Sequence, residues 1–327
     1  MRQNNIFLML LKVFFFSSIL VTTSAVRAEL KVVTTIKPLH SLIANVMDGV
    51  GEPALIIEGS TSPHSFTLKP SHAKLLEEAD IIFWVGESIE TFMERPLESI
   101  VKNAEVVEFM EVESINKLKF REESIFEDHD DHDNHDDHDD NDDHDEHDDQ
   151  NGHDDHGHAH GEFDAHIWLD PMNAKEMVHE IAHELSDLDP ANKDKYEANA
   201  QATIQALDQL VKDIEKEINK DAKFVVFHDA YQYFEERFGV RAAGALTLNT
   251  DVLPGAKQIA DIQDVIKDRG IKCIFSEPQF NPKIITTIAE DMNIKTGVFD
   301  PLGANIDSNK DLYFKLIQNL GDELKGC

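Results

Sequence analysis

Short apolar runs rich in β-branched residues alternate along the chain with longer segments whose apolar residues recur every three or four positions. The first pattern predicts buried strands and the second predicts amphipathic helices. In the first half, the strand-like runs lie at 31–36, 54–58, 80–86 and 105–110. In the second half, they lie at 223–227, 241–246, 272–276 and 294–300. This alternation predicts two α/β lobes, each with a mainly parallel sheet flanked by helices.

One long segment separates the two sets of strands. Residues 191–220 contain no glycine or proline and are rich in Ala, Gln, Glu, Lys and Leu, which predicts a single helix of about eight turns. We therefore expect a first lobe over 29–189, a linking helix over 190–220 and a second lobe over 221–327. Ligands of open α/β sheets bind beyond the carboxyl ends of strands, so the loops that follow strands are the places to look for chemistry.

The N-terminal segment is typical of an export signal. Basic residues Arg2 and Lys12 accompany an apolar run that reaches Val21, and small residues lead to Ala28. This pattern predicts a cleavable signal peptide over 1–28 and export of the mature protein. A retained membrane anchor is the alternative, but the uninterrupted apolar stretch is short for a bilayer span of about 20 residues.

The charge of the chain is very uneven. The formal net charge is −34, but residues 127–162 hold eighteen carboxylates, ten histidines and no lysine or arginine, which leaves about −16 on the rest. Nucleic acid would be repelled by such a chain, and cations are its natural partners.

The segment 127–162, called the His/Asp tract below, cannot fold by burying apolar surface. Its imidazoles and carboxylates form many similar sets, so we expect several weakly bound zinc ions there. An acidic solubilising loop is the alternative, but it leaves the histidines without a role. The histidines of the tract are His129, His132, His135, His138, His144, His147, His153, His156, His158 and His160.

Three histidines outside the tract lie in loops at the ends of predicted strands or in the ordered segment that we expect directly after the tract. His64 follows the second strand, His166 lies in FDAHIWLDP after the tract, and His228 ends an apolar strand. Asp300 ends the last strand in the same way. One such histidine alone is more often structural, but three with a carboxylate predict a zinc site, because zinc takes neutral imidazoles in a tetrahedral arrangement with water or carboxylate completing the shell.

A competing motif lies on a predicted helix. HEIAH, from His179 to His183, fits the H-E-x-x-H signature of zinc metalloproteases. Helical periodicity places the apolar residues on one face and both histidines nearly opposite, toward solvent. The longer H-x-x-G-x-x-H extension is also missing. We therefore expect a surface pair and no enzyme, with an exported metalloprotease as the alternative.

The chain contains two cysteines, Cys273 and Cys327. In an oxidising compartment such a pair predicts one disulfide, and two free thiols are the alternative.

Several longer segments resemble those of ZnuA-like proteins, the periplasmic zinc-binding components of ABC transporters. They are SPHSFTLKPSHAKLLEEADIIFWVG, DAHIWLDPMNA, FVVFHDAYQYFEERFGV, IFSEPQFNP and FDPLGANI. The resemblance implies two four-stranded lobes joined by a rigid helix, with one zinc ion in the cleft between them. It places the zinc ligands on His64, His166 and His228, and a residue that ligates or faces the metal on Asp300. The paired cysteines and the histidine-rich loop also match the zinc members.

The resemblance has one departure and several functional implications. Some members have a glutamate before the first histidine, where this chain has Pro63, so the fourth ligand is either Asp300 or water. The implied function is capture of Zn²⁺ and its delivery to a membrane permease, by a protein that we expect to be a monomer. A metal-binding adhesin is an alternative function.

Overall fold

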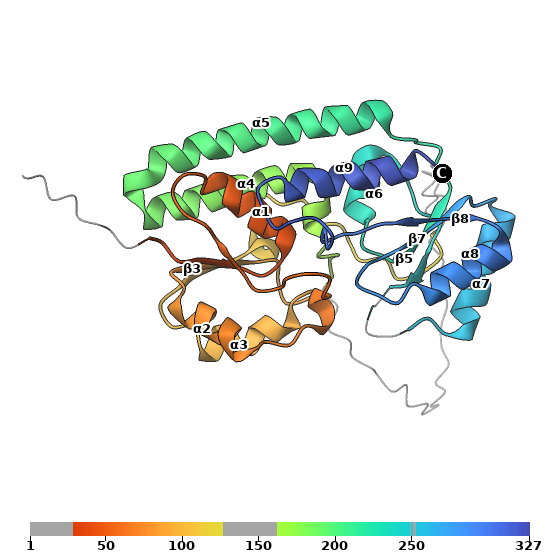
Figure 1. Ribbon diagram of the computed structural model, residues 1–327, viewed down its shortest axis with the longest axis horizontal. Helices are drawn as coiled ribbons and strands as arrows, with labels where there is room; N and C mark the ends of the chain where they lie inside the picture. Colours follow the sequence, from red (N-terminus) through yellow and green to blue (C-terminus); the bar gives the residue numbers. More distant parts are fainter. Residues whose placement is uncertain (1–28, 127–161, 249, 251–252) are drawn as a thin grey trace, which may run out of the picture.

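The computed structural model describes residues 29–126, 162–248, 250 and 253–327. The predicted signal peptide and nearly all of the His/Asp tract lie outside the described residues. Within the described part, no helix is long and apolar enough to cross a bilayer. Figure 1 shows the chain coloured along its sequence.

The first lobe is a parallel sheet with strand order β2-β1-β3-β4. Its strands are β1 (Val32–Thr34), β2 (Ala54–Leu55), β3 (Ile81–Trp84) and β4 (Glu105–Glu108). Its helices are α1 (Lys37–Val46), α2 (Pro70–Glu78) and α3 (Glu94–Ser99). The register places Val33 opposite Ile82, and both side chains are buried. Each strand falls inside its predicted run but is shorter.

The second lobe repeats this plan with strand order β6-β5-β7-β8, again parallel. Its strands are β5 (Phe224–His228), β6 (Ala245–Thr247), β7 (Cys273–Ser276) and β8 (Lys295–Val298). Its flanking helices are α6 (Gln232–Phe238), α7 (Ala256–Asp268) and α8 (Lys283–Met292). Short 3-10 turns lie at Pro63–Ser65, Thr91–Met93, Phe109–Glu111, Ile167–Leu169 and Pro190–Asn192. The prediction of two four-stranded α/β lobes is confirmed.

A layer of helices lies along one side of both lobes (Figure 1). It contains α4 (Pro171–Leu188), α5 (Lys193–Glu217) and α9 (Leu312–Leu324). The long helix α5 is the predicted linking helix, and it packs against α4, α1 and α9. The last helix of the chain, α9, packs against α1 of the first lobe, so the lobes are joined by more than one connection.

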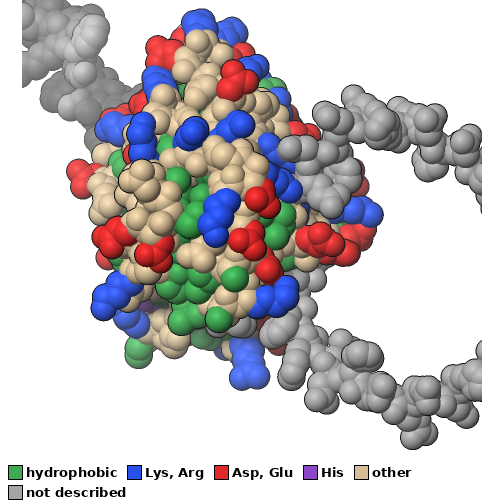
Figure 2. All heavy atoms as spheres, turned by 90° about the vertical axis from the view of Figure 1, so that its right-hand side faces the viewer, with side chains coloured by type: hydrophobic (Ala, Val, Ile, Leu, Met, Phe, Trp, Pro, Cys, Tyr) green, Lys and Arg blue, Asp and Glu red, His purple; other side chains and the backbone are tan. Residues whose placement is uncertain are grey.

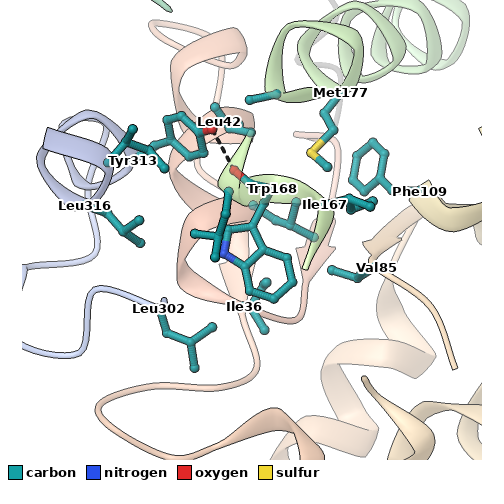
Figure 3. Close-up of a cluster of buried hydrophobic side chains, with 14 of the residues drawn as sticks. Ile36, Leu42, Val85, Phe109, Ile167, Trp168, Met177, Leu302, Tyr313 and Leu316 are labelled. Carbon is teal, nitrogen blue, oxygen red and sulfur yellow. Dashed lines mark hydrogen bonds between the residues drawn. The ribbon is translucent and has the colours of Figure 1, made fainter. Parts of the chain in front are cut away.

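The hydrophobic core is continuous between the lobes next to Trp168 (Figure 3). Ile36 and Val85 come from the first lobe, and Leu302 and Tyr313 follow β8. Tyr313 donates a hydrogen bond to the Trp168 carbonyl at 2.7 Å, and the Trp168 indole donates to the Pro301 carbonyl at 2.8 Å. Because burial of apolar area is the main stabilising contribution, this shared core resists separation of the lobes.

Two further links cross between distant parts of the sequence. Ile125 forms an antiparallel bridge to Gly244 at the edge of the second sheet, although it lies in the range expected for the first lobe. Cys273 on β7 forms a disulfide with Cys327, with Cα atoms 5.6 Å apart, which ties the C-terminus to the second sheet.

The end of the molecule formed by the second lobe has no single sign of charge. Figure 2 shows basic and acidic side chains interspersed with apolar ones on that face. Of the formal net charge of −34, the His/Asp tract accounts for eighteen negative charges, so about −16 belongs to the rest of the chain.

Candidate metal centre

The fold brings three predicted histidines together from three separate segments. His64 lies in the 3-10 turn after β2, His166 precedes the 3-10 turn that leads into α4, and His228 is the last residue of β5. His166 and His228 are 6 % and 4 % exposed, and His64 is half-buried. His64 therefore lies in the loop after a strand and His228 at the end of one, whereas His166 lies at the start of the turn that leads into α4.

The ring nitrogens of these histidines converge on one point. One nitrogen from each ring lies within 4.8 Å of the other two. The Nε2 atoms of His166 and His228 are closest, at 3.3 Å. Neutral imidazole nitrogens with this convergence can act together as ligands of a transition metal.

Two buried carboxylates lie behind the cluster. Asp164 Oδ1 is 2.7 Å from His166 Nδ1, and Glu277 Oε1 is 2.7 Å from His228 Nδ1. Asp164 and Glu277 are 2 % and 3 % exposed, respectively. Each contact occupies the ring nitrogen that points away from the other imidazole.

The electrostatic surroundings are acidic. Burial lowers the pKa of His228, but the charge and hydrogen bond of Glu277 raise it. The charges of Asp229 and Asp164 add to this effect, so the pKa is raised overall. Burial also raises the pKa of the adjacent Asp229 to about 7, helped by the charge of Glu235 and opposed by Arg121. Arg121 pairs with both Asp229 and Glu235, at 2.9 and 2.7 Å. The site therefore attracts positive charge, whether from protons or from a metal ion.

The histidines line a small cavity of about 20 Å³. A space of this size holds roughly one water-sized species. Phe120, Phe163 and Leu248 supply apolar walls. The cavity suits a single ion and leaves no room for an organic solute.

A buried glutamate fixes one wall of this cavity. Glu90 accepts hydrogen bonds from the backbone N–H groups of Val85 and Gly86 at 2.8 and 3.2 Å. Burial raises its pKa to about 7, against the effect of these hydrogen bonds. The loop held in this way supplies Ser88 and Ile89 to the cavity lining.

The structure does not bring Asp300 into the cluster. Its Oδ1 accepts from the Gln279 amide at 3.0 Å and the Leu302 N–H at 3.2 Å, and its Oδ2 accepts from the Ala304 N–H at 2.6 Å. Asp300 lines a separate groove between β8 and α9. Its carboxylate therefore stabilises the turn after β8, because the backbone donors of that turn satisfy it locally.

The other histidines of the described residues have separate environments. His179 and His183 are exposed on α4, opposite its buried face, as the helical periodicity predicts. His40 Nε2 contacts the Pro53 carbonyl at 3.1 Å, and His72 Nδ1 accepts from the Lys69 N–H at 3.2 Å. Neither contact brings a metal ligand nearby. The histidines of the His/Asp tract lie outside the described residues.

Sequence reasoning assigned no role to Asp164 or Glu277. Asp164 lies two residues before a candidate ligand, and Glu277 follows the end of β7, beside β5 in the sheet. A carboxylate next to a candidate histidine in the sequence, or at the end of the neighbouring strand, is the signal that could have found them.

Two α/β lobes with a shared core and three converging imidazoles between them are the features of a two-lobed metal-binding protein. Comparisons with known proteins agree. Residues 32–327 match the family described as "ZnuA: Zinc-uptake complex component A periplasmic". The high-affinity zinc uptake system protein ZnuA of Brucella abortus is 48 % identical over 303 residues, covering 90 % of this chain and 91 % of that protein. This chain therefore belongs to the ZnuA family of periplasmic zinc-uptake proteins.

Solved structures show the same fold at lower identity. A zinc-bound deletion mutant of a ZnuA has a TM-score of 0.69 at 21 % identity, covering 90 % of this chain and 98 % of that one. The laminin-binding protein Lmb of Streptococcus agalactiae, described as having adhesin and metal-transporting activity, has a TM-score of 0.68 at 24 % identity, covering 90 % and 100 %.

Proposed function

We propose that this protein binds one Zn²⁺ tightly through His64, His166 and His228, and delivers it to the permease of an ABC transporter. The separation of 3.3 Å between the Nε2 atoms of His166 and His228 carries the proposal. Two nitrogens bound to one zinc at about 2.0–2.1 Å with a tetrahedral angle lie roughly 3.3–3.4 Å apart. Two of the ligands thus already have the spacing that the metal needs.

His64 completes the set of protein ligands. Its ring nitrogen lies within 4.8 Å of the others, so a small rotation of this half-buried side chain is enough to reach the metal. A water molecule takes the fourth position, because Asp300 is held by its own turn. Three imidazoles favour zinc over manganese, and copper or nickel would compete by affinity, so metal availability decides between them.

Delivery to the permease takes place with little movement of the lobes against each other. The core around Trp168 is continuous between them, and α9 packs on α1. Opening the whole cleft would expose that apolar surface, whereas a change confined to the loops that carry the histidines would not. Release of the ion by local loop movement is therefore the less costly route.

The His/Asp tract binds additional, weaker zinc ions. Its residues repeat the same ligand types many times, and each binding event must also order the chain, which costs about 1–2 kcal/mol per residue fixed. Two roles fit this chemistry: enrichment of zinc near the cleft, or sensing that slows uptake when zinc is plentiful.

The experiment is a zinc titration of the full chain and of its three single variants, His64→Ala, His166→Ala and His228→Ala. A competing chelator strips the weaker ions, so that only the tight site remains loaded. We expect one tight ion in the wild type and a large loss of affinity in each variant. Unchanged affinity in all three variants would contradict the site.

A further inference from the structure

Two of the three imidazoles are paired with a buried carboxylate, one in each half of the molecule. Asp164, two residues before His166, contacts Nδ1 of that ring at 2.7 Å. Glu277 contacts Nδ1 of His228 at 2.7 Å, from the end of β7 to the end of β5. The two pairs face each other across the cavity through their Nε2 atoms.

These contacts determine which nitrogen of each ring is free. An ionised carboxylate only accepts hydrogen bonds, so Nδ1 of each ring carries the proton, and Nε2 of the neutral imidazole is a bare lone pair. Both lone pairs then point at one location, 3.3 Å apart. Two facing lone pairs repel unless a proton or a metal ion lies between them.

We propose that Asp164 and Glu277 are the positioning residues of the zinc site. They commit His166 and His228 to binding through Nε2, and they place one negative charge behind each ligand, which together balance a divalent cation. This inference rests on the proposed function and deepens it by naming residues that do not touch the metal.

Both carboxylates are themselves held in place. Asp164 Oδ1 also accepts from the His166 backbone N–H at 3.0 Å, and the Asp164 carbonyl accepts from the Tyr233 hydroxyl at 2.5 Å. Glu277 follows β7, whose first residue, Cys273, is joined to the C-terminus by the disulfide. A carboxylate fixed by its own backbone and sheet can fix the imidazole that it contacts.

The charges of these two carboxylates are available to the metal. Arg121 also feels the charge of Asp164, but its ion pairs are with Asp229 and Glu235. Within the same residues, Asp164 and Glu277 pair only with the imidazoles. A bound cation would therefore receive their charge through the rings.

The test separates the hydrogen bond from the charge. Zinc affinity is measured in the full chain, with a chelator competing for the ion, for Asp164→Ala, Asp164→Asn, Glu277→Ala and Glu277→Gln. The alanine variants should bind about 10- to 100-fold more weakly, as expected when a partner behind a zinc histidine is removed. The amide variants still accept the Nδ1 proton, so they should recover part of that loss. Glu290→Ala, an exposed position on α8, is the matched control.

A second measurement keeps the test decisive if an alanine variant folds poorly. Cobalt substituted for zinc reports ligand geometry through its visible absorption, and the amide variants should keep the wild-type spectrum while losing affinity. Alanine variants that bind zinc as tightly as the control, or amide variants that bind no better than alanine, would overturn the positioning role. His228→Ala separates the two proposals: if it loses zinc while Glu277→Ala does not, the site stands and the positioning role falls.

Discussion

Among the described residues, two pairs of histidines invite comparison, and the ring nitrogens of only one of these two pairs converge. His179 and His183 are close in the sequence and fit the H-E-x-x-H motif, whereas His166 and His228 are 62 residues apart and lie in two separate segments. The first pair is exposed on α4, with the His183 side chain 63 % exposed. The second pair is buried, and its nitrogens converge.

The difference is in what surrounds each ring. His166 and His228 each have a buried carboxylate that fixes the orientation of the ring, and both are shielded from water. His183 lies 3.8 Å from Asp187, but both side chains are largely exposed and free to rotate. An exposed imidazole must lose side-chain entropy to bind a metal, whereas a buried and oriented one has lost it during folding. We therefore expect the orientation of the rings, more than their spacing in the sequence, to decide which pair binds a metal ion tightly.

The largest expected effect comes from removing one member of the buried pair. Zinc at about 100 times its Kd stabilises the folded wild type by about 2.7 kcal/mol, since it binds the folded state. In His228→Ala this zinc-dependent stabilisation should nearly disappear, because a ligand is gone. Thermal unfolding with and without zinc measures the effect, and His179→Ala serves as the control. If zinc stabilises His228→Ala as much as the wild type, the buried pair has no greater role in zinc binding than the exposed pair.

The pH dependence of zinc binding should differ from that of an ordinary imidazole site. The pKa of His228 is raised by Glu277 despite burial, so in the metal-free protein its proton stays on to a higher pH. The protonated ring stabilises the folded, metal-free protein. This contribution is fully present below about pH 6.5, the pKa of histidine in the unfolded chain, and is lost as pH rises through the higher pKa of His228 in the folded protein. Zinc must displace that proton, so affinity should fall as pH drops, by up to about tenfold per unit for each proton displaced.

This behaviour is checked by measuring zinc affinity in steps from about pH 8 to pH 5.5. The decline should begin above the ordinary imidazole range in the wild type. If zinc affinity instead begins to decline only below about pH 6, then a proton on His228 does not compete with zinc in the way that the contact with Glu277 predicts.

Replacing Asp300 should have a smaller effect. Its oxygens already accept three hydrogen bonds from Gln279, Leu302 and Ala304. In Asp300→Asn we expect zinc affinity to change by less than about tenfold. Replacing a residue that hydrogen-bonds a metal ligand typically lowers affinity by about 10- to 100-fold, so this change would be smaller. Calorimetric titration against the wild type measures it. A loss as large as that of His228→Ala would identify Asp300 as a fourth ligand.

Removing the exposed pair should have the smallest effect. The double variant His179→Ala/His183→Ala leaves the buried face of α4 intact, so unfolding free energy should change by no more than about 0.5 kcal/mol per site. Tight zinc binding should be unchanged. Loss of the tight ion in this variant, or chelator-sensitive cleavage of an unfolded casein by the wild type, would restore the metalloprotease alternative.

The sequence by itself determined the elements and the ligand candidates. Strands were predictable because apolar β-branched runs can be buried on both faces of a parallel sheet, and α5 because thirty residues without glycine or proline favour one helix. The three candidate ligands stood out by their positions: His64 and His228 lie at or just after the ends of strands, and His166 lies directly after the His/Asp tract. The carboxyl ends of parallel strands share one edge of a sheet, where ligands bind.

Only the tertiary structure decided which of these candidates meet. Asp300 also follows a strand closely, yet its carboxylate accepts hydrogen bonds from the backbone of its own turn and is not part of the cluster. Glu277 looked ordinary in the sequence, yet the order β5-β7 sets it beside His228, 49 residues away. Contacts of this kind depend on strand order and on which local hydrogen bonds a side chain already makes, and neither is encoded in the spacing of residues along the chain.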